Sequence, residues 1–231
     1  MKGYIEKQGI HEVLEEIRRQ GQEVSSFFSM GKISAAAWYG VNEADILIMG
    51  CRDPLKVKVE ITHSWGQPIL HLLLEDSRIQ VLSFKDRSLY VGLLSPGAFK
   101  KFFHVDIAPD IVWSVLRAYP TIREHEYVSA EGNRILLLDG KQVEVERIHL
   151  YPETLSPRRV SYRDNKLEIS FKGFRKEGGI SYAEEVAIRD RKEKLVIRND
   201  RMVFNRDMPQ EVFEMRIPPG FETRLLEDHI N

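Results

Sequence analysis

The side chains that could do chemistry are spread thinly along this 231-residue chain. Its seven histidines are His11, His63, His71, His104, His125, His149 and His229. None of them forms the H-x-H, H-x-x-x-H or H-E-x-x-H spacing that brings imidazoles to one metal ion. His125 and His149 are expected on separate strands and could meet in space. An internal pocket in which either of them meets a carboxylate or a metal would indicate an enzyme. Spacing alone predicts no catalytic residue, no metal ligand and no cofactor.

The other reactive groups give no local signal of catalysis either. Cys51 closes the apolar run Ile46–Cys51, which looks like a lipidation signal but lies in the middle of the chain and is better interpreted as a buried strand. No serine lies in a Gly-x-Ser-x-Gly turn, and no glycine cluster matches a phosphate-binding loop. We therefore expect a protein that is not an enzyme and whose function lies in what it binds.

Charge and composition narrow the classes of partner. The 34 Lys and Arg nearly balance the 35 Asp and Glu, so we expect no nucleic-acid partner. A single cysteine excludes an internal disulfide. The segment Met1–Glu6 lacks the apolar stretch of a signal peptide. Two alternatives stay open: a cytoplasmic protein, or an exported one whose leader has been removed.

Strands account for most of the pattern along the chain. Leu55, Val57, Val59 and Ile61 alternate with polar residues, which gives one apolar and one wet face. Short turns join successive segments, so neighbours should be antiparallel. We expect strands at Lys32–Tyr39, Glu43–Cys51, Leu55–His63, Ile69–Glu75, Arg78–Lys85 and Ser88–Leu93, then at Glu126–Ala130, Arg134–Asp139, Gln142–Leu150, Pro157–Arg163, Lys166–Phe174, Ile180–Arg189 and Lys194–Asn205.

Two segments have the spacing of amphipathic helices. One runs from Gly9 to about Phe28, and the other runs from Pro109 to about Tyr119, where Pro120 stops it. Ala98–His104 could add one or two helical turns, Pro209–Glu214 could hold one more, and an irregular tail follows. The prediction is a mainly β fold: one domain over residues 1–231, with a helix, a meander to about residue 93, a helix near 109–119, a second meander over 126–205 and a tail.

This order of elements resembles the LolA/LolB-like outer-membrane lipoprotein carriers and receptors. The likeness rests on Gly31–Ser34 opening a strand, on the amphiphilic strand and turn of Ile46–Leu55, and on Gly66–Leu70, Ile79–Leu82 and Leu89–Gly92. It ends with Val203–Asn205 and Val212–Phe221, which look like the closing "F-x-x-x-x-P-x-G-F" of these relatives. The resemblance implies a curved, unclosed antiparallel half-barrel, helices covering its concave side, and an apolar cavity for the acyl chains of lipoproteins.

The resemblance also suggests where to look for the site. We expect the cavity to involve Leu55, Val57, Val59, Ile61, Leu72 and Leu74, and the lid to be the helix bearing Ile111, Val112, Val115 and Leu116. In the receptor branch an apolar residue protrudes from the loop between the third and fourth strands, and here that loop carries Trp65. A lipidated N-terminal cysteine or a cleaved leader, expected of a receptor or a carrier, is absent from this sequence.

The function expected from this resemblance is non-enzymatic binding of lipid or lipoprotein acyl chains during envelope lipoprotein trafficking or biogenesis. The protein would be periplasmic or associated with the outer membrane, peripheral or anchored through an N-terminal segment not present here, and it could have an envelope protein as partner. The alternative is a structural or interaction module that docks a protein through a sheet edge or the Trp65 loop. A concave side packed solid with side chains would favour this alternative.

Overall fold

The computed structural model describes residues 7–35, 43–163, 167–190 and 193–226. The far end of the predicted strand Lys32–Tyr39 and the start of the predicted strand Lys166–Phe174 lie outside the described residues. No helix within the described ranges has the length and the hydropathy that crossing a membrane requires.

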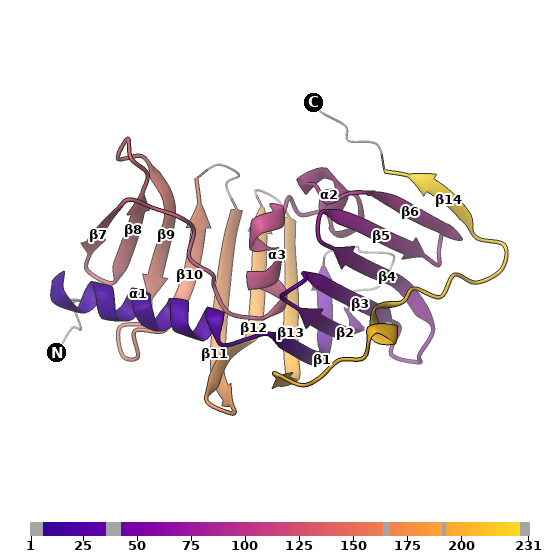
Figure 1. The fold of residues 1–231 in the computed structure, drawn as a ribbon, viewed down its shortest axis with the longest axis horizontal. Coiled ribbons are helices and arrows are strands. Elements are labelled where there is room, and N and C mark those ends of the chain that lie inside the picture. Colours follow the sequence, from indigo (N-terminus) through magenta and orange to yellow (C-terminus); the bar gives the residue numbers. More distant parts are fainter. Residues whose placement is uncertain (1–6, 36–42, 164–166, 191–192, 227–231) are drawn as a thin grey trace.

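One large open sheet dominates the described chain (Figure 1). Its first half consists of β1 (Ser26–Ala35), β2 (Glu43–Cys51), β3 (Lys56–Thr62), β4 (Pro68–Glu75), β5 (Arg78–Ser83) and β6 (Ser88–Leu93). Its second half consists of β7 (Tyr127–Glu131), β8 (Arg134–Leu138), β9 (Glu144–Leu150), β10 (Pro157–Tyr162), β11 (Leu167–Glu177), β12 (Ile180–Asp190) and β13 (Glu193–Phe204). A last strand, β14 (Glu222–Leu225), completes the fourteen. The predicted mainly β class with an unclosed sheet is confirmed.

The two halves meet at a central seam. The spatial order is β14-β6-β5-β4-β3-β2-β1-β13-β12-β11-β10-β9-β8-β7, so β1 pairs with β13 although they are far apart in the sequence. The register shifts between Met30 and Gly31. Here the buried Asn199 side chain accepts a hydrogen bond from Ser29 Oγ at 2.8 Å and donates one to Ala183 O at 2.9 Å. The seam joins two meanders into a single sheet.

Three α-helices in the described chain cover one face of the sheet, which we call the inner face (Figure 1). They are α1 (Lys7–Gln22), α2 (Pro96–Phe103) and α3 (Pro109–Leu116). Ser95 caps α2, since its side chain accepts a hydrogen bond from Ala98 N, and Pro96 occupies the first turn. The helices and the inward positions of the strands form one continuous apolar core. This arrangement places α3 over the middle of the sheet and α2 beside it, toward β5 and β6 (Figure 1).

The opposite, outer face is largely polar, and the C-terminal segment crosses part of it. A cross-strand row of alternating charges includes Lys172, Glu185 and Arg198, with the Lys172 and Glu185 side chains 3.1 Å apart. Beyond β13, the short 3-10 helix η2 (Gln210–Phe213) packs Phe213 against Met49 and Leu73. The inner face, with its helices, is therefore where an apolar ligand site is to be sought.

Three expectations need correction. The first helix ends at Gln22 and not near Phe28, because Ser26 to Phe28 are the first residues of β1 and pair with β2. The second helix ends at Leu116 and not at Tyr119, since Ala118 takes a left-handed backbone conformation with φ of 60°. The tail is not wholly irregular: β14 pairs with β6 in parallel, so the sheet is mixed and not purely antiparallel.

Candidate functional site

The candidate site is the apolar interior between the sheet and helices α2 and α3. Here the structure encloses a cavity of about 30 Å³. Every side chain around it is apolar; the lining residues are Ile33, Ile46, Val59, Leu72, Phe99, Phe103, Ile107, Val115, Leu116, Ile188, Leu195 and Ile197. Since a water occupies about 10–15 Å³ on such a measure, this space holds about two or three water-sized spheres and no acyl chain. The interior is apolar and nearly filled.

The strand residues expected at the cavity all belong to the inner face or its margin. Val57, Val59, Ile61, Leu72 and Leu74 are buried in the core, and Val59 and Leu72 line the cavity itself. Leu55 lies in the turn before β3 and is only partly buried against the core. Sequence alternation thus identified the inward register of β3, while the role of these residues in binding stays a prediction.

The expected lid helix is buried on almost every side. Ile111, Val112, Val115 and Leu116 of α3 all belong to the core, and Val115 and Leu116 line the cavity. On α2, Phe99 and Phe103 line it as well, and this eight-residue helix agrees with the one or two turns expected there. Apolar positions Phe99, Phe102 and Phe103 are the signal that predicts an inward face for α2.

A buried arginine ties the end of α3 to its neighbours. Arg117 is 0% exposed, and its guanidinium donates to Gln20 O of α1 at 2.7 Å and to Ser181 O of β12 at 2.9 Å. It also lies 4.6 Å from the ring centroid of Tyr119. Burial lowers the pKa of Arg117 to about 10 and raises the pKa of Tyr119 to about 12, so at neutral pH the arginine is charged and the tyrosine neutral.

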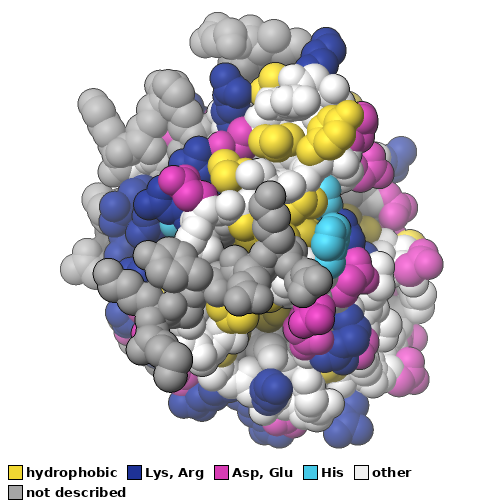
Figure 2. Space-filling view, turned by 90° about the vertical axis from the view of Figure 1, so that its left-hand side faces the viewer, with side chains coloured by type: hydrophobic (Ala, Val, Ile, Leu, Met, Phe, Trp, Pro, Cys, Tyr) yellow, Lys and Arg dark blue, Asp and Glu magenta, His cyan; other side chains and the backbone are white. Residues whose placement is uncertain are grey.

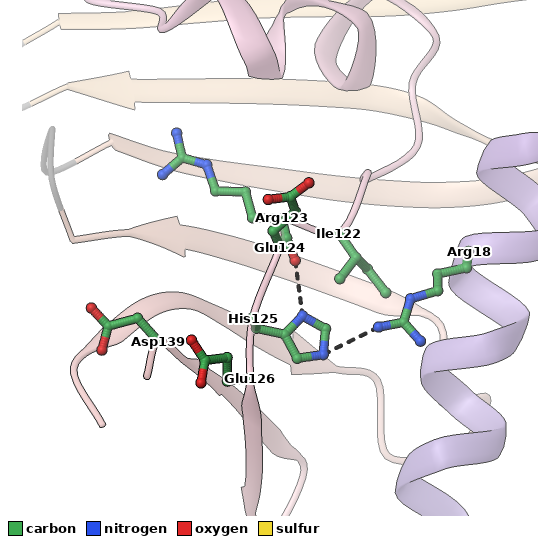
Figure 3. A pocket seen from close by; sticks show the side chains of 7 residues that line it. All are labelled: Arg18, Ile122, Arg123, Glu124, His125, Glu126 and Asp139. Carbon is green, nitrogen blue, oxygen red and sulfur yellow. Dashed lines mark hydrogen bonds between the residues drawn. The ribbon is translucent and has the colours of Figure 1, made fainter. Parts of the chain in front are cut away.

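A second polar feature lies on the chain segment between α3 and β7. An open cleft of about 560 Å³ is lined by Arg18, Ile122, Arg123, Glu124, His125, Glu126 and Asp139 (Figure 3). His125 Nε2 accepts a hydrogen bond from Arg18 at 3.1 Å, because a guanidinium has only donors, so Nδ1 carries the proton and donates to Arg123 O at 2.8 Å. Figure 2 shows this end of the molecule, where charged and histidine side chains surround small apolar patches.

The two histidines that were expected to be able to meet in space, His125 and His149, do not come together in the described structure. His125 lies on the helix-covered side, whereas His149 follows the buried Ile148 on β9 and points to the outer face, between Arg134 and Arg159 of the adjacent strands. Burial, followed by the nearby arginines, lowers the pKa of His149. Within the described ranges no three His, Cys, Asp or Glu side chains gather where they could hold a metal ion.

Among the described residues, Trp65 is the most exposed aromatic side chain. It is 70% exposed at the β3–β4 turn, and its ring stacks on His63 with centroids 4.3 Å apart. Hydrogen bonds from His63 N to Gln67 O and from Gly66 N to His63 O fix the turn, and Gly66 supplies the positive φ of 86° that it needs. The indole is therefore presented on a well-defined turn.

Several solved structures share this architecture. A LolA superfamily protein from Nitrosomonas europaea matches with a TM-score of 0.57 and 14% identity, over 87% of this chain and 97% of that one. A DUF1329 family protein from Desulfovibrio piger gives 0.58 and 14%, over 89% and 97% of the two chains. A domain from Vibrio parahaemolyticus, named for outer membrane lipoprotein sorting, gives 0.58 and 9%, over 87% and 94%.

Sequence comparisons add nothing to this result, because no family model and no curated protein matches the chain. The structural matches extend over most of this chain and nearly all of each neighbour. Identities this low establish the fold alone. The resemblance drawn from the order of elements is confirmed at that level: the chain has the fold of the LolA superfamily and of outer membrane lipoprotein-sorting proteins.

Proposed function

We propose that the protein binds acyl chains of lipids or lipoproteins between the inner face of its sheet and helices α2 and α3, without catalysing a reaction. The observation that carries the proposal is the cavity lining, in which all twelve side chains are apolar. The fold supports it, because one neighbour with that fold is named for outer membrane lipoprotein sorting. By the same analogy we place the protein in the cell envelope, periplasmic or at the outer membrane.

The filled interior sets a condition on this function. A cavity of about 30 Å³ admits no acyl chain, so α2 and α3 have to move away from the inner face before one can enter. The gain that drives entry is burial of methylenes, at about 0.8 kcal/mol each. The cost is loss of the contacts that Phe99, Phe103, Val115 and Leu116 make with the sheet. A net affinity therefore requires a chain of many methylenes.

Enlarging the cavity tests this proposal. We expect Leu72→Ala to tighten binding of a fluorescent fatty acid about fourfold for each further methylene accommodated, since 0.8 kcal/mol corresponds to that factor. Leu73→Ala is the matched control: Leu73 neighbours Leu72 in β4 but packs under the C-terminal segment on the outer face. Titration of the probe, with mass spectrometry of co-purified lipid, gives the result. A folded protein that binds no acyl probe at all contradicts the proposal.

A second function is favoured by the filled interior and by Trp65. In this alternative the sheet is a scaffold, and the β3–β4 turn docks the exposed indole on an envelope protein or a membrane. The two functions depend on different residues. Acyl binding depends on the cavity lining, whereas docking depends on Trp65.

Replacing the indole tests the docking alternative. We expect Trp65→Ala to change the free energy of unfolding by no more than about 0.5 kcal/mol, because the side chain is exposed. Its co-sedimentation with vesicles of phosphatidylethanolamine and phosphatidylglycerol should fall at least severalfold. Tyr127→Ala removes an exposed aromatic ring from β7 at the far edge of the sheet and is the control. Equal sedimentation of all three proteins argues against a membrane contact at Trp65.

A further inference from the structure

Arg123 connects α3 to two adjacent strands of the sheet, β9 and β10. Its backbone N–H donates to Glu146 Oε2 of β9 at 2.9 Å, and its Nε donates to Asp110 Oδ2 at 2.8 Å. Asp110 belongs to the first turn of α3. The Arg123 guanidinium also lies over the ring of Tyr162 in β10, 4.5 Å from its centroid. Besides the packing of Ile111 and Val112 in the core, Arg123 thus gives the first turn of α3 a polar link to the sheet.

Glu146 is an unusual partner for such a contact because its carboxyl is wholly enclosed. The residue is 0% exposed, and in the sheet it lies between Leu137 of β8 and Tyr162 of β10. Its Oε1 has no hydrogen-bond partner in the described structure. The charged side chains that act on it are Arg123 from the covering segment and Asp110 from α3. From α1, Arg18 pairs with Glu15 and donates to His125, which in turn donates to Arg123 O.

Burial makes the ionised form of the Glu146 side chain unfavourable. Burial raises its pKa from 4.5 to about 7, against the lowering effects of the Arg123 hydrogen bond and charge. A neutral carboxyl fits the site, since it is enclosed and accepts one hydrogen bond. An ionised carboxylate needs water or a closer cation, and it gains either one only if residues 121–126 move away from the sheet. Because Arg123 lies in this segment, the movement also breaks its contact with Asp110.

We propose that Arg123, Glu146 and Asp110 form a proton-controlled latch: loss of the Glu146 proton releases residues 121–126, and with them the first turn of α3, from the inner face. Closure is favoured in acid and opening at neutral pH. The latch explains how a filled interior could be made accessible without a ligand. Only its use in admitting an acyl chain rests on the proposed function, whereas the opening itself does not.

The sign and the pH window follow from the proton balance. The closed form holds the Glu146 proton up to about pH 7, whereas the opened, hydrated carboxyl releases it near pH 4.5. Between these values each opening event releases one proton, so the opening equilibrium increases about tenfold per pH unit. Below about pH 4.5 and above about pH 7 both forms carry the same number of protons, and the dependence levels off.

Hydrogen exchange of the full chain, without any ligand, tests the latch. We expect protection factors, which correct for the intrinsic pH dependence of exchange, to fall for residues 109–126 between pH 5 and pH 7 and then to stay level. Glu146→Gln has no proton to lose and should give a flat profile over this range. Glu124→Gln, a change at an exposed carboxylate in the same segment, should follow the wild type.

Two results would overturn the latch: a flat profile in the wild type, or the same slope in Glu146→Gln as in the wild type. Asp110→Asn keeps the proposal testable if Glu146→Gln does not fold, since it weakens the link to α3 and leaves Glu146 in place. In that variant the slope should persist for residues 121–126 and shrink for 109–116. Failure of acyl-probe binding leaves all of these readouts unchanged, so the two proposals fail separately.

Discussion

Gly31→Ala is expected to prevent folding or to lower the free energy of unfolding by about 3 kcal/mol or more. A Cβ at this position would lie 1.8 Å from the carbonyl oxygen of Arg198, at the register shift of the β1–β13 seam. The clashing atom belongs to the backbone, so no side-chain rotation relieves it. Strands β1 and β13 would have to separate, and the two halves of the sheet would then separate as well. Urea unfolding followed by circular dichroism measures the change.

Gly21→Ala provides the matched comparison for this substitution. Gly21 lies in α1, and a Cβ there meets nothing within 4 Å. Alanine should stabilise the helix by about 0.5–1 kcal/mol, because it loses less backbone entropy on folding than glycine. If Gly31→Ala instead unfolds at the same urea concentration as the wild type, the seam does not have the close approach described above.

Arg117→Met should cost about 3 kcal/mol, although methionine fills much of the same volume. The change leaves Gln20 O and Ser181 O without their charged donor, and each buried carbonyl that loses its partner costs about 1–3 kcal/mol. It also removes the guanidinium from above Tyr119. Because Arg117 links α1, α3 and β12, hydrogen exchange should increase in all three elements. Chemical unfolding with calorimetry gives the magnitude.

Arg52→Met separates loss of an arginine from loss of this particular clamp. Arg52 is exposed and also donates to a carbonyl of α1, Gly21 O at 2.8 Å. Solvent can replace that hydrogen bond, so we expect a change within about 0.5 kcal/mol. Similar losses for the two variants would mean that burial of Arg117 does not determine its contribution.

Local pattern predicted most strands because each has one buried and one open face. The alternation of β3, for example, matches its observed burial residue by residue. The spacing of apolar residues is ambiguous where it fits both the helical period and the alternation of a strand. Val24, Phe27 and Phe28 fit a helical face, yet Phe27 pairs with Gly50 and Phe204 as part of β1. Tertiary pairing, and not local propensity, decided the conformation there.

The buried charged residues could have been predicted only from their position in the alternation of each strand or helix, and not from their residue type. Glu146 has the same phase in β9 as the buried Ile148 and Leu150, so its inward position was implied. Charged residues are usually exposed, and that expectation hid it. Arg117 similarly follows a helix that is apolar on nearly every side. In β14, all four residues are exposed, so no apolar alternation marks the strand. Its parallel pairing with β6 depends on the path of the C-terminal segment and not on a local sequence pattern.

The central seam also constrains the order of events during synthesis. Phe27 pairs with Phe204, so the two middle strands of the sheet meet only after all the residues between them have left the ribosome. Until then β1 can pair only with β2, and its other edge presents free backbone groups to any passing strand. Contacts this distant in sequence favour slow folding. We therefore expect shortened chains that lack β13 to aggregate, and a chaperone-like binder of extended segments to assist the nascent protein.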